Sequence, residues 1–176
     1  LTVGADNTDT TFAGNFLSHG SLTKIGTGTL TLSGSSPYAQ AITINNGILK
    51  LGSSNVANYA LNSSAATSIL VNSGGTFDLN GYDGVNNVSG GFVTLNGAGY
   101  NNLGALRNSA VGTTSTLNTR YWNWGVNPSI SKTGNLIIGS YYECSGSAGT
   151  CAKPTVNVSG TGILDASGLL YVSNAN

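Results

Sequence analysis

One short pattern recurs along this chain and limits what the chain can fold into. A glycine is followed by one or two residues, an apolar residue, any residue, a second apolar residue and then, within two residues, another glycine. An apolar residue at every second position predicts a short β-strand with one apolar face. The pattern occurs at residues 28–34, 47–52, 75–81, 91–97, 134–139 and 162–168.

The spacing of these segments indicates a stacked repeat. Their first apolar residues stand at positions 30, 49, 77, 93, 136 and 164, so the steps are 19, 28, 16, 43 and 28 residues. We interpret the step of 43 as two turns, which gives a repeat unit of about 20 to 28 residues. A shorter apolar segment precedes several of them, at 42–44, 69–71 and 156–158, and a corner rich in Gly and Asn separates the two.

Strands this short cannot bury an apolar face alone, but equivalent strands stacked on one another form a continuous core. The predicted fold is therefore all-β: a right-handed, single-stranded parallel β-helix, or β-solenoid, with about seven or eight rungs. Asn residues at equivalent corners are expected to form hydrogen-bonded ladders. An antiparallel sandwich or barrel is the alternative, and the similarity between segments favours the β-helix. Residues 1–176 are expected to form a single domain.

Composition excludes several other classes of protein. Charged residues make up 7% of the chain and the formal net charge is zero, so the chain lacks the basic field that a nucleic-acid-binding protein needs. Uninterrupted apolar runs reach only about three or four residues, too few for a transmembrane helix. Disorder is a further alternative for a Gly- and Asn-rich chain, but 39% hydrophobic residues at regular spacing argue against it.

The N-terminal third resembles a known family. It resembles the autotransporter-associated β-strand repeat of passenger-type bacterial surface proteins at residues 1–14, 20–34 and 38–52. Within the second of these segments, Leu22-Thr23-Lys24 is followed by the glycine-flanked segment 28–34. The resemblance is closest over residues 1–52, and residues 104–108 resemble a second phrase of such proteins. It implies rungs of a right-handed β-helix in an exported protein, of which this chain is a segment, and it supplies no catalytic residues.

Two cysteines flank a loop of six small residues. Cys144 and Cys151 enclose a segment flexible enough to bring them within disulfide distance, and we expect a disulfide in a loop that protrudes at residues 140–155, beside Tyr141 and Tyr142. A disulfide implies an oxidising compartment. A metal or redox pair is the alternative, but the only histidine is His19 and the cysteine spacing is not Cys-x-x-Cys.

Aromatic residues are densest within the 43-residue step. Strand alternation predicts that Tyr121 and Asn123 face one side and that Trp122 and Trp124 face the other. One interpretation is that these rings fill the core, and the other is that they form an exposed platform for a sugar ring or a protein partner. Arg120 and Asn123 would then supply hydrogen bonds to hydroxyl groups.

The acidic residues do not suggest an enzyme. Glycoside hydrolysis generally needs two carboxylates across the scissile bond. Asp78 and Asp165 occupy similar positions in their segments, but 87 residues separate them, which places them several rungs apart. Asp6 and Asp9 lie in a turn that resembles the family, and His19 stands alone at a predicted corner. We therefore expect no catalysis, no metal and no cofactor.

These expectations combine into a functional hypothesis with one alternative. The chain is predicted to be a non-enzymatic structural or adhesive module at the bacterial cell surface, with self-association through uncapped end rungs into head-to-tail filaments. It would contact glycans or other cell surfaces through its loops. The alternative is a carbohydrate-binding module built on Tyr121, Trp122 and Trp124. The candidate ligand or partner contacts are these three residues together with Arg120, Tyr141 and Tyr142.

Overall fold

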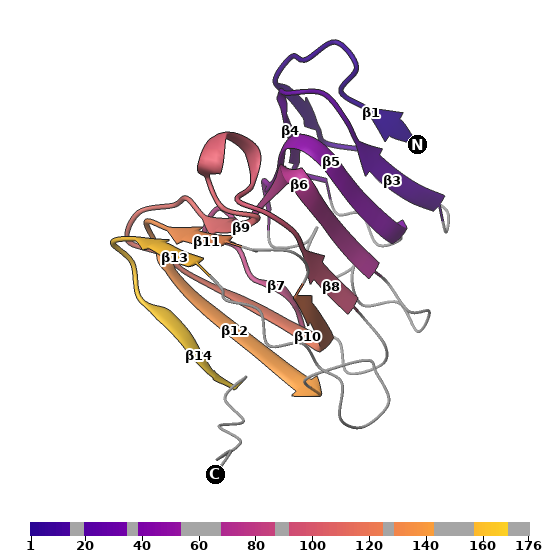
Figure 1. Cartoon of the computed structure of the whole chain (residues 1–176). Coiled ribbons are helices and arrows are strands. Elements are labelled where there is room, and N and C mark those ends of the chain that lie inside the picture. The colour runs from indigo at the N-terminus through magenta and orange to yellow at the C-terminus, as the bar shows by residue number, and fades with distance from the viewer. Residues whose placement is uncertain are drawn as a thin grey trace.

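The computed structural model describes the backbone of residues 1–14, 20–34, 39–53, 68–86, 92–124, 129–142 and 157–168. Side chains are described for most of these residues, but not for 39–40, 84–86, 92, 118–124, 137–142, 157 and 165–168. Every strand pairing among these residues is parallel, and the chain winds from rung to rung as a β-solenoid (Figure 1). The all-β parallel class expected from the sequence is confirmed.

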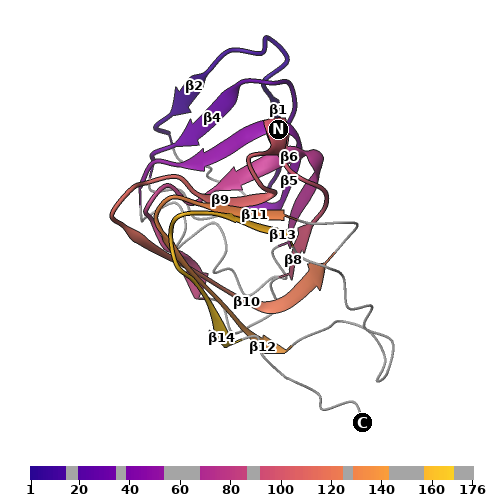
Figure 2. The same cartoon turned by 60° about the vertical axis from the view of Figure 1, so that its left-hand side comes forward.

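The described strands are arranged on three faces around a common axis (Figure 2). The first face contains β1 (Thr2–Val3), β3 (Gly20–Lys24), β8 (Phe92–Leu95) and the first halves of β5 (Ala39–Leu51) and β6 (Ser68–Asp78). The second contains β2 (Thr10–Phe12), β4 (Thr29–Leu32), the second halves of β5 and β6, β9 (Leu106–Asn108), β11 (Ser129–Lys132) and β13 (Asn157–Gly160). The third contains β7 (Gly84–Asn86), β14 (Leu164–Gly168) and the first halves of β10 (Thr114–Trp124) and β12 (Asn135–Tyr142).

Register on the second face gives one continuous inward column. Residues one rung apart pair in the order Thr10, Leu30, Leu49, Phe77, Leu106, Ile130 and Val158. Neighbouring strands in such a stack lie about 4.8 Å apart, so each side chain packs on those above and below it.

The number of rungs differs slightly from the seven or eight expected from the sequence. Seven strands stack on the second face, and about four turns have described strands on all three faces. In the first three rungs the structure describes strands on the first and second faces only.

A single aliphatic core fills the space between the faces. The buried side chains alternate with outward-facing ones along each strand, as in β4 and β11, where every second residue is buried. The largest fully buried apolar residues include Ile44, Leu49, Phe77, Leu95 and Ile130, all with no more than 1% of their surface exposed. This alternation is why strands of only four residues are stable here: each contributes two side chains to a shared core.

The six glycine-flanked segments do not all lie on the same face, although their similar sequences suggested one equivalent position. Leu30, Leu49 and Phe77 share the second face, as expected. Val93 pairs instead with Ile69 on the first face, and Leu136 pairs with Leu164 on the third. The physical reason is that every face needs the same alternation toward the axis, so the pattern identifies a strand but not its face.

Corners depend on residues that tolerate a left-handed backbone. Gly26 (φ +67°) and Gly47 (φ +68°) turn the chain between the first and second faces of consecutive rungs. One rung further on, Asn72 Nδ2 donates to Asn45 Oδ1 at 2.7 Å, so the expected asparagine ladder is confirmed for this pair.

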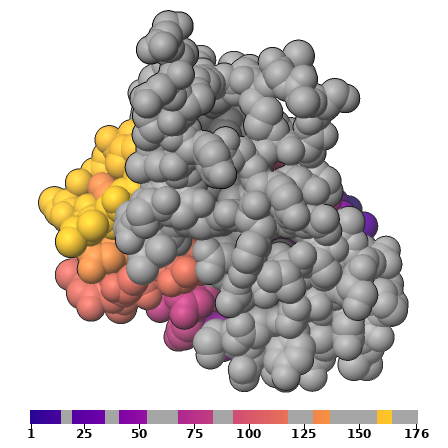
Figure 3. All heavy atoms as spheres, turned by 90° about the horizontal axis from the view of Figure 1, so that it is seen from below, coloured from indigo at the N-terminus to yellow at the C-terminus, as the bar shows by residue number. Residues whose placement is uncertain are grey.

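Two inward-facing residues of the second face are partly exposed, one at each edge of the described stack. Phe12 pairs with the buried Leu32 but is 37% exposed, and Val158 pairs with the fully buried Ile130 but is 48% exposed. In Figure 3 the yellow C-terminal residues lie at an outer edge of the molecule, beside the orange and salmon residues of the preceding rungs.

We predict that Gly26→Ala is far more destabilising than Gly112→Ala. Both glycines have similar positive φ values, +67° and +72°, so both alanines carry roughly 1–2 kcal/mol of backbone strain. A Cβ at Gly26 would also collide with the carbonyl oxygen of Gly4, whereas a Cβ at Gly112 meets nothing within 4 Å. Chemical denaturation should show a loss above about 3 kcal/mol for Gly26→Ala. Equal losses would contradict this account of the corner.

Candidate functional site

Strand register assigns positions to the aromatic cluster. Trp122 of β10 pairs with Val93, and Trp124 pairs with Leu95. Val93 and Leu95 are both buried and belong to the inward columns of the first face. The register thus aligns the backbone of the two tryptophans with buried residues of the first face.

Tyr121 has a different set of neighbours. It pairs with Phe92 of β8 on one side and with Tyr142 of β12 on the other, so three aromatic residues occupy one row across adjacent strands. We call these positions the aromatic row. Phe92 was missed from the sequence because it lies in a separate glycine-flanked segment, and only the register connects it to Tyr121.

The other expected site residues are not brought into this row. Arg120 and Tyr141 each precede a member of the row by one residue, so they fall on the alternate positions of β10 and β12. Cys144, Cys151 and His19 lie outside the described residues, and the disulfide remains a prediction.

The carboxylates with described side chains accept hydrogen bonds from backbone amides. Asp9 accepts from Thr29 N–H at 2.6 Å, and Asp83 accepts from Thr116 N–H at 2.8 Å. Asp78, which is 3% exposed, accepts from the N–H groups of Asn80 and Ser109 at 2.9 and 3.1 Å. These side chains satisfy donors at turns that the strand ladders leave unpaired.

The sequence suggested equivalent positions for Asp78 and Asp165, but the structure places them on different faces. Asp78 pairs with Lys50 and Arg107 on the second face, whereas Asp165 pairs with Ile137 on the third. The shared local pattern again failed to identify the face. Among the residues whose side chains are described, no three His, Cys, Asp or Glu residues are grouped in a way that would hold a metal ion.

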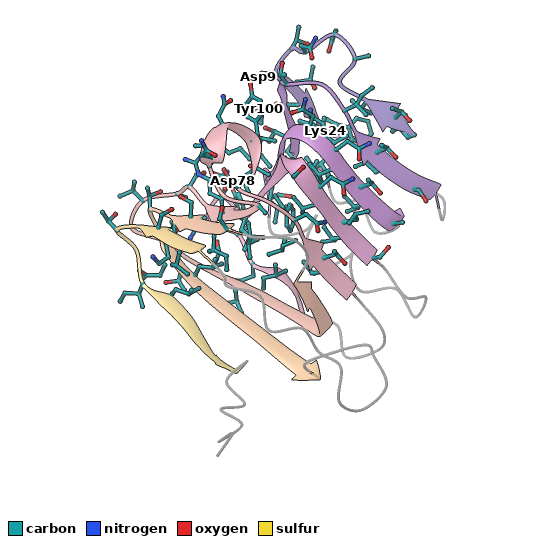
Figure 4. All side chains as sticks on the ribbon, in the orientation of Figure 1. Asp9, Lys24, Asp78 and Tyr100 are labelled. Carbon is teal, nitrogen blue, oxygen red and sulfur yellow. The ribbon has the colours of Figure 1, made fainter. Side chains whose placement is uncertain are left out.

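Lys24 is the most unusual polar residue of the structure. Its side chain is only 1% exposed, and its ammonium group donates to the carbonyl oxygens of Ile25, Gly26 and Asn46 at 2.7, 2.8 and 3.3 Å. Burial lowers the pKa of Lys24 below its ordinary value, and the nearby charges of Asp9 and Asp6 oppose that shift. Figure 4 shows Lys24 in the upper rungs, below the loop that carries Asp9. We call the three carbonyl groups the carbonyl cage.

Comparison with known protein families gives one match. Residues 22–51 match the passenger-associated-transport-repeat. The resemblance inferred from the sequence is thereby confirmed for this segment, which we call the passenger repeat. No curated protein and no solved structure matches the chain.

The passenger repeat corresponds to two rungs of the solenoid. It begins within β3 and ends with the last residue of β5, and it contains Lys24 and the whole carbonyl cage. Repeats of this family belong to autotransporter passengers, so the match implies an exported protein of the cell surface. No helix in the described part of the chain is long and apolar enough to span a membrane.

We predict that the pKa of Asp6 rises toward 3.8 when Thr8 is replaced by Val. The Thr8 hydroxyl and then the Thr8 amide donate to the Asp6 carboxylate, at 2.8 and 3.3 Å, and these hydrogen bonds lower the pKa of Asp6 below 3.8. A carboxyl with a lowered pKa stabilises the folded state above 3.8, and this contribution is lost as the pH falls through the lowered value. NMR titration of the Asp6 carboxyl carbon measures the change. Thr11→Val is the control, and an equal shift there would contradict the assignment.

Proposed function

We propose that this chain is a non-enzymatic structural module of an exported bacterial surface protein, and that its stacked rungs act as a spacer that displays loops. The single observation that carries the proposal is the inward column in which seven strands stack in register, with the passenger repeat forming two of its rungs. A solenoid gains length by adding rungs, since each rung contacts only its neighbours.

Two further observations support a structural role. The described side chains of Asp9, Asp78 and Asp83 are already engaged with backbone amides, which leaves them poorly placed for proton transfer to a substrate. The chain is also neutral overall, with six basic and six acidic residues, which suits many weak polar contacts rather than attraction of a charged ligand.

The proposal includes association through the edges of the stack. Val158 continues an inward column yet is 48% exposed, and Phe12 is 37% exposed at the opposite edge. A further rung, from a neighbouring segment or a second copy, would cover these side chains and pair with the edge strands. Edge pairing of unlike ends is heterologous, so it produces open filaments rather than closed rings.

We predict that Val158→Lys weakens self-association at least about tenfold, because a charge at the edge blocks strand pairing. Val111→Lys is the matched control, since Val111 is 82% exposed at a corner away from the edge strands. Sedimentation velocity over a concentration series and negative-stain electron microscopy measure association of the unmodified chain and both variants. A chain that stays monomeric throughout, or equal effects of the two variants, would exclude the filament part of the proposal.

The aromatic row favours a second candidate function, carbohydrate binding. Phe92, Tyr121 and Tyr142 pair with one another across adjacent strands, about 4.8 Å apart. Flat aromatic faces repeated along a sheet suit stacking against the apolar faces of sugar rings. On this assignment the ligand would be an extended glycan that runs across the strands.

Tyr121→Ala is expected to reduce glycan-array binding at least about tenfold, since it removes the centre of the row. Tyr100→Ala is the control because Tyr100 lies in the short 3₁₀ turn η1 (Tyr100–Asn102), away from the row. If Tyr121→Ala binds as the unmodified chain does, carbohydrate binding through the aromatic row is wrong. Circular dichroism of both variants confirms that they remain folded.

A further inference from the structure

Lys24 occupies a position that is otherwise aliphatic. On the first face, residues that pair from rung to rung are Val3, Lys24, Ile44, Val71 and Leu95. Lys24 is therefore the one charged member of this column, with 1% of its surface exposed. Burial of an ammonium group is costly unless its hydrogen bonds are replaced, so this position needs a specific environment.

The carbonyl cage supplies that environment in full. An ammonium group has three donor hydrogens, and Lys24 Nζ has three carbonyl acceptors. Ile25 and Gly26 belong to the corner of its own rung, whereas Asn46 belongs to the corner of the next rung. A single side chain thus connects two consecutive corners of the solenoid.

Glycines leave the space that the ammonium group fills. A Cβ added at Gly47 would lie 2.8 Å from Lys24 Nζ, and one added at Gly4 would lie 3.2 Å from it. Gly4, from the preceding rung, has φ +103° and Gly47 has φ +68°. The cradle around Nζ therefore involves three successive rungs and depends on their mutual alignment.

That alignment is not determined by apolar packing alone. The strand segments at 22–24, 42–44, 69–71 and 93–95 share the same alternation, so a stack displaced by one rung would bury apolar side chains almost as well. The corners differ, however. Pairing shifts between Ile44 and Asn46, because the corner that follows Val71 has one more residue than the corner that follows Ile44. A displaced stack would present Lys24 with this longer corner.

We propose that Lys24 is a register pin: its ammonium group can complete its hydrogen bonds only at the corner formed by Asn45, Asn46 and Gly47. This requirement selects one alignment among several strands of similar sequence. A buried polar group that fixes register at some cost in stability is a known device in other folds. In this chain the pin lies inside the passenger repeat, and the inference does not depend on the proposed spacer function.

Lys24→Met tests the pin, because methionine fills the core but cannot donate to the cage. Lys50→Met is the matched control: Lys50 lies in the same passenger repeat, on the outward side of the second face. For Lys24→Met we expect additional amide resonances from residues 20–32. We also expect at least about tenfold faster hydrogen exchange at Thr23 and Ile25, whose amides donate to Leu1 and Val3 carbonyls. A single resonance set with unchanged exchange would overturn the proposal.

A second measurement uses the unmodified chain and does not require the variant to fold. Partial acetylation under native conditions, followed by peptide mass spectrometry, compares the reactivity of individual lysines. Lys24 should react at least about tenfold more slowly than Lys50, because its ammonium group is enclosed by the cage. Equal reaction rates would show that the cage is open and would overturn the proposal.

Discussion

The parallel alignment of each strand with the strand one rung away is the constraint on which the rest of the structure depends. It places Leu49 on Leu30 and Phe77 on Leu49, so that strands of a few residues share one core. It also brings the corners into line, where a Cβ at Gly26 would collide with the backbone of Gly4. The abundance of glycine is therefore a consequence of stacking corners at strand spacing, rather than a sign of disorder.

Corners also explain where the polar residues of this chain are used. Strand ladders leave backbone donors and acceptors unpaired at each turn, and buried backbone groups need partners. Asp9 and Asp83 accept from amides, Asn72 donates to Asn45, and Lys24 donates to carbonyls. The charged groups of these residues are engaged in hydrogen bonds to the backbone, so they retain little capacity for acid–base chemistry. This is consistent with a structural role.

Sequence alone was sufficient for the fold class and insufficient for the placement of faces. The two-residue alternation at Leu30, Leu49 and Phe77 indicated strands, and their similarity indicated stacking. The same alternation serves all three faces, so nothing local distinguished Val93 on the first face from Leu136 on the third. The aromatic row could not be predicted from the sequence for the same reason: Phe92 and Tyr121 are neighbours only through register. Lys24 carried a local signal, since it stands at an inward position of the strand, but its third acceptor, Asn46, comes from a corner 22 residues later.

Uniform rungs make a solenoid easy to extend and, by the same property, easy to misalign. Polar groups inside the stack counteract this ambiguity, because they are satisfied by one set of neighbours only. Asn108 is fully buried, accepts from the amides of Gly81 and Ala110, and donates to the carbonyl of Asn135. Lys24 has this role in the N-terminal rungs, and Asn108 has it in the later rungs. Apolar residues therefore supply most of the stability of the stack, and the few buried polar residues determine which strand lies on which.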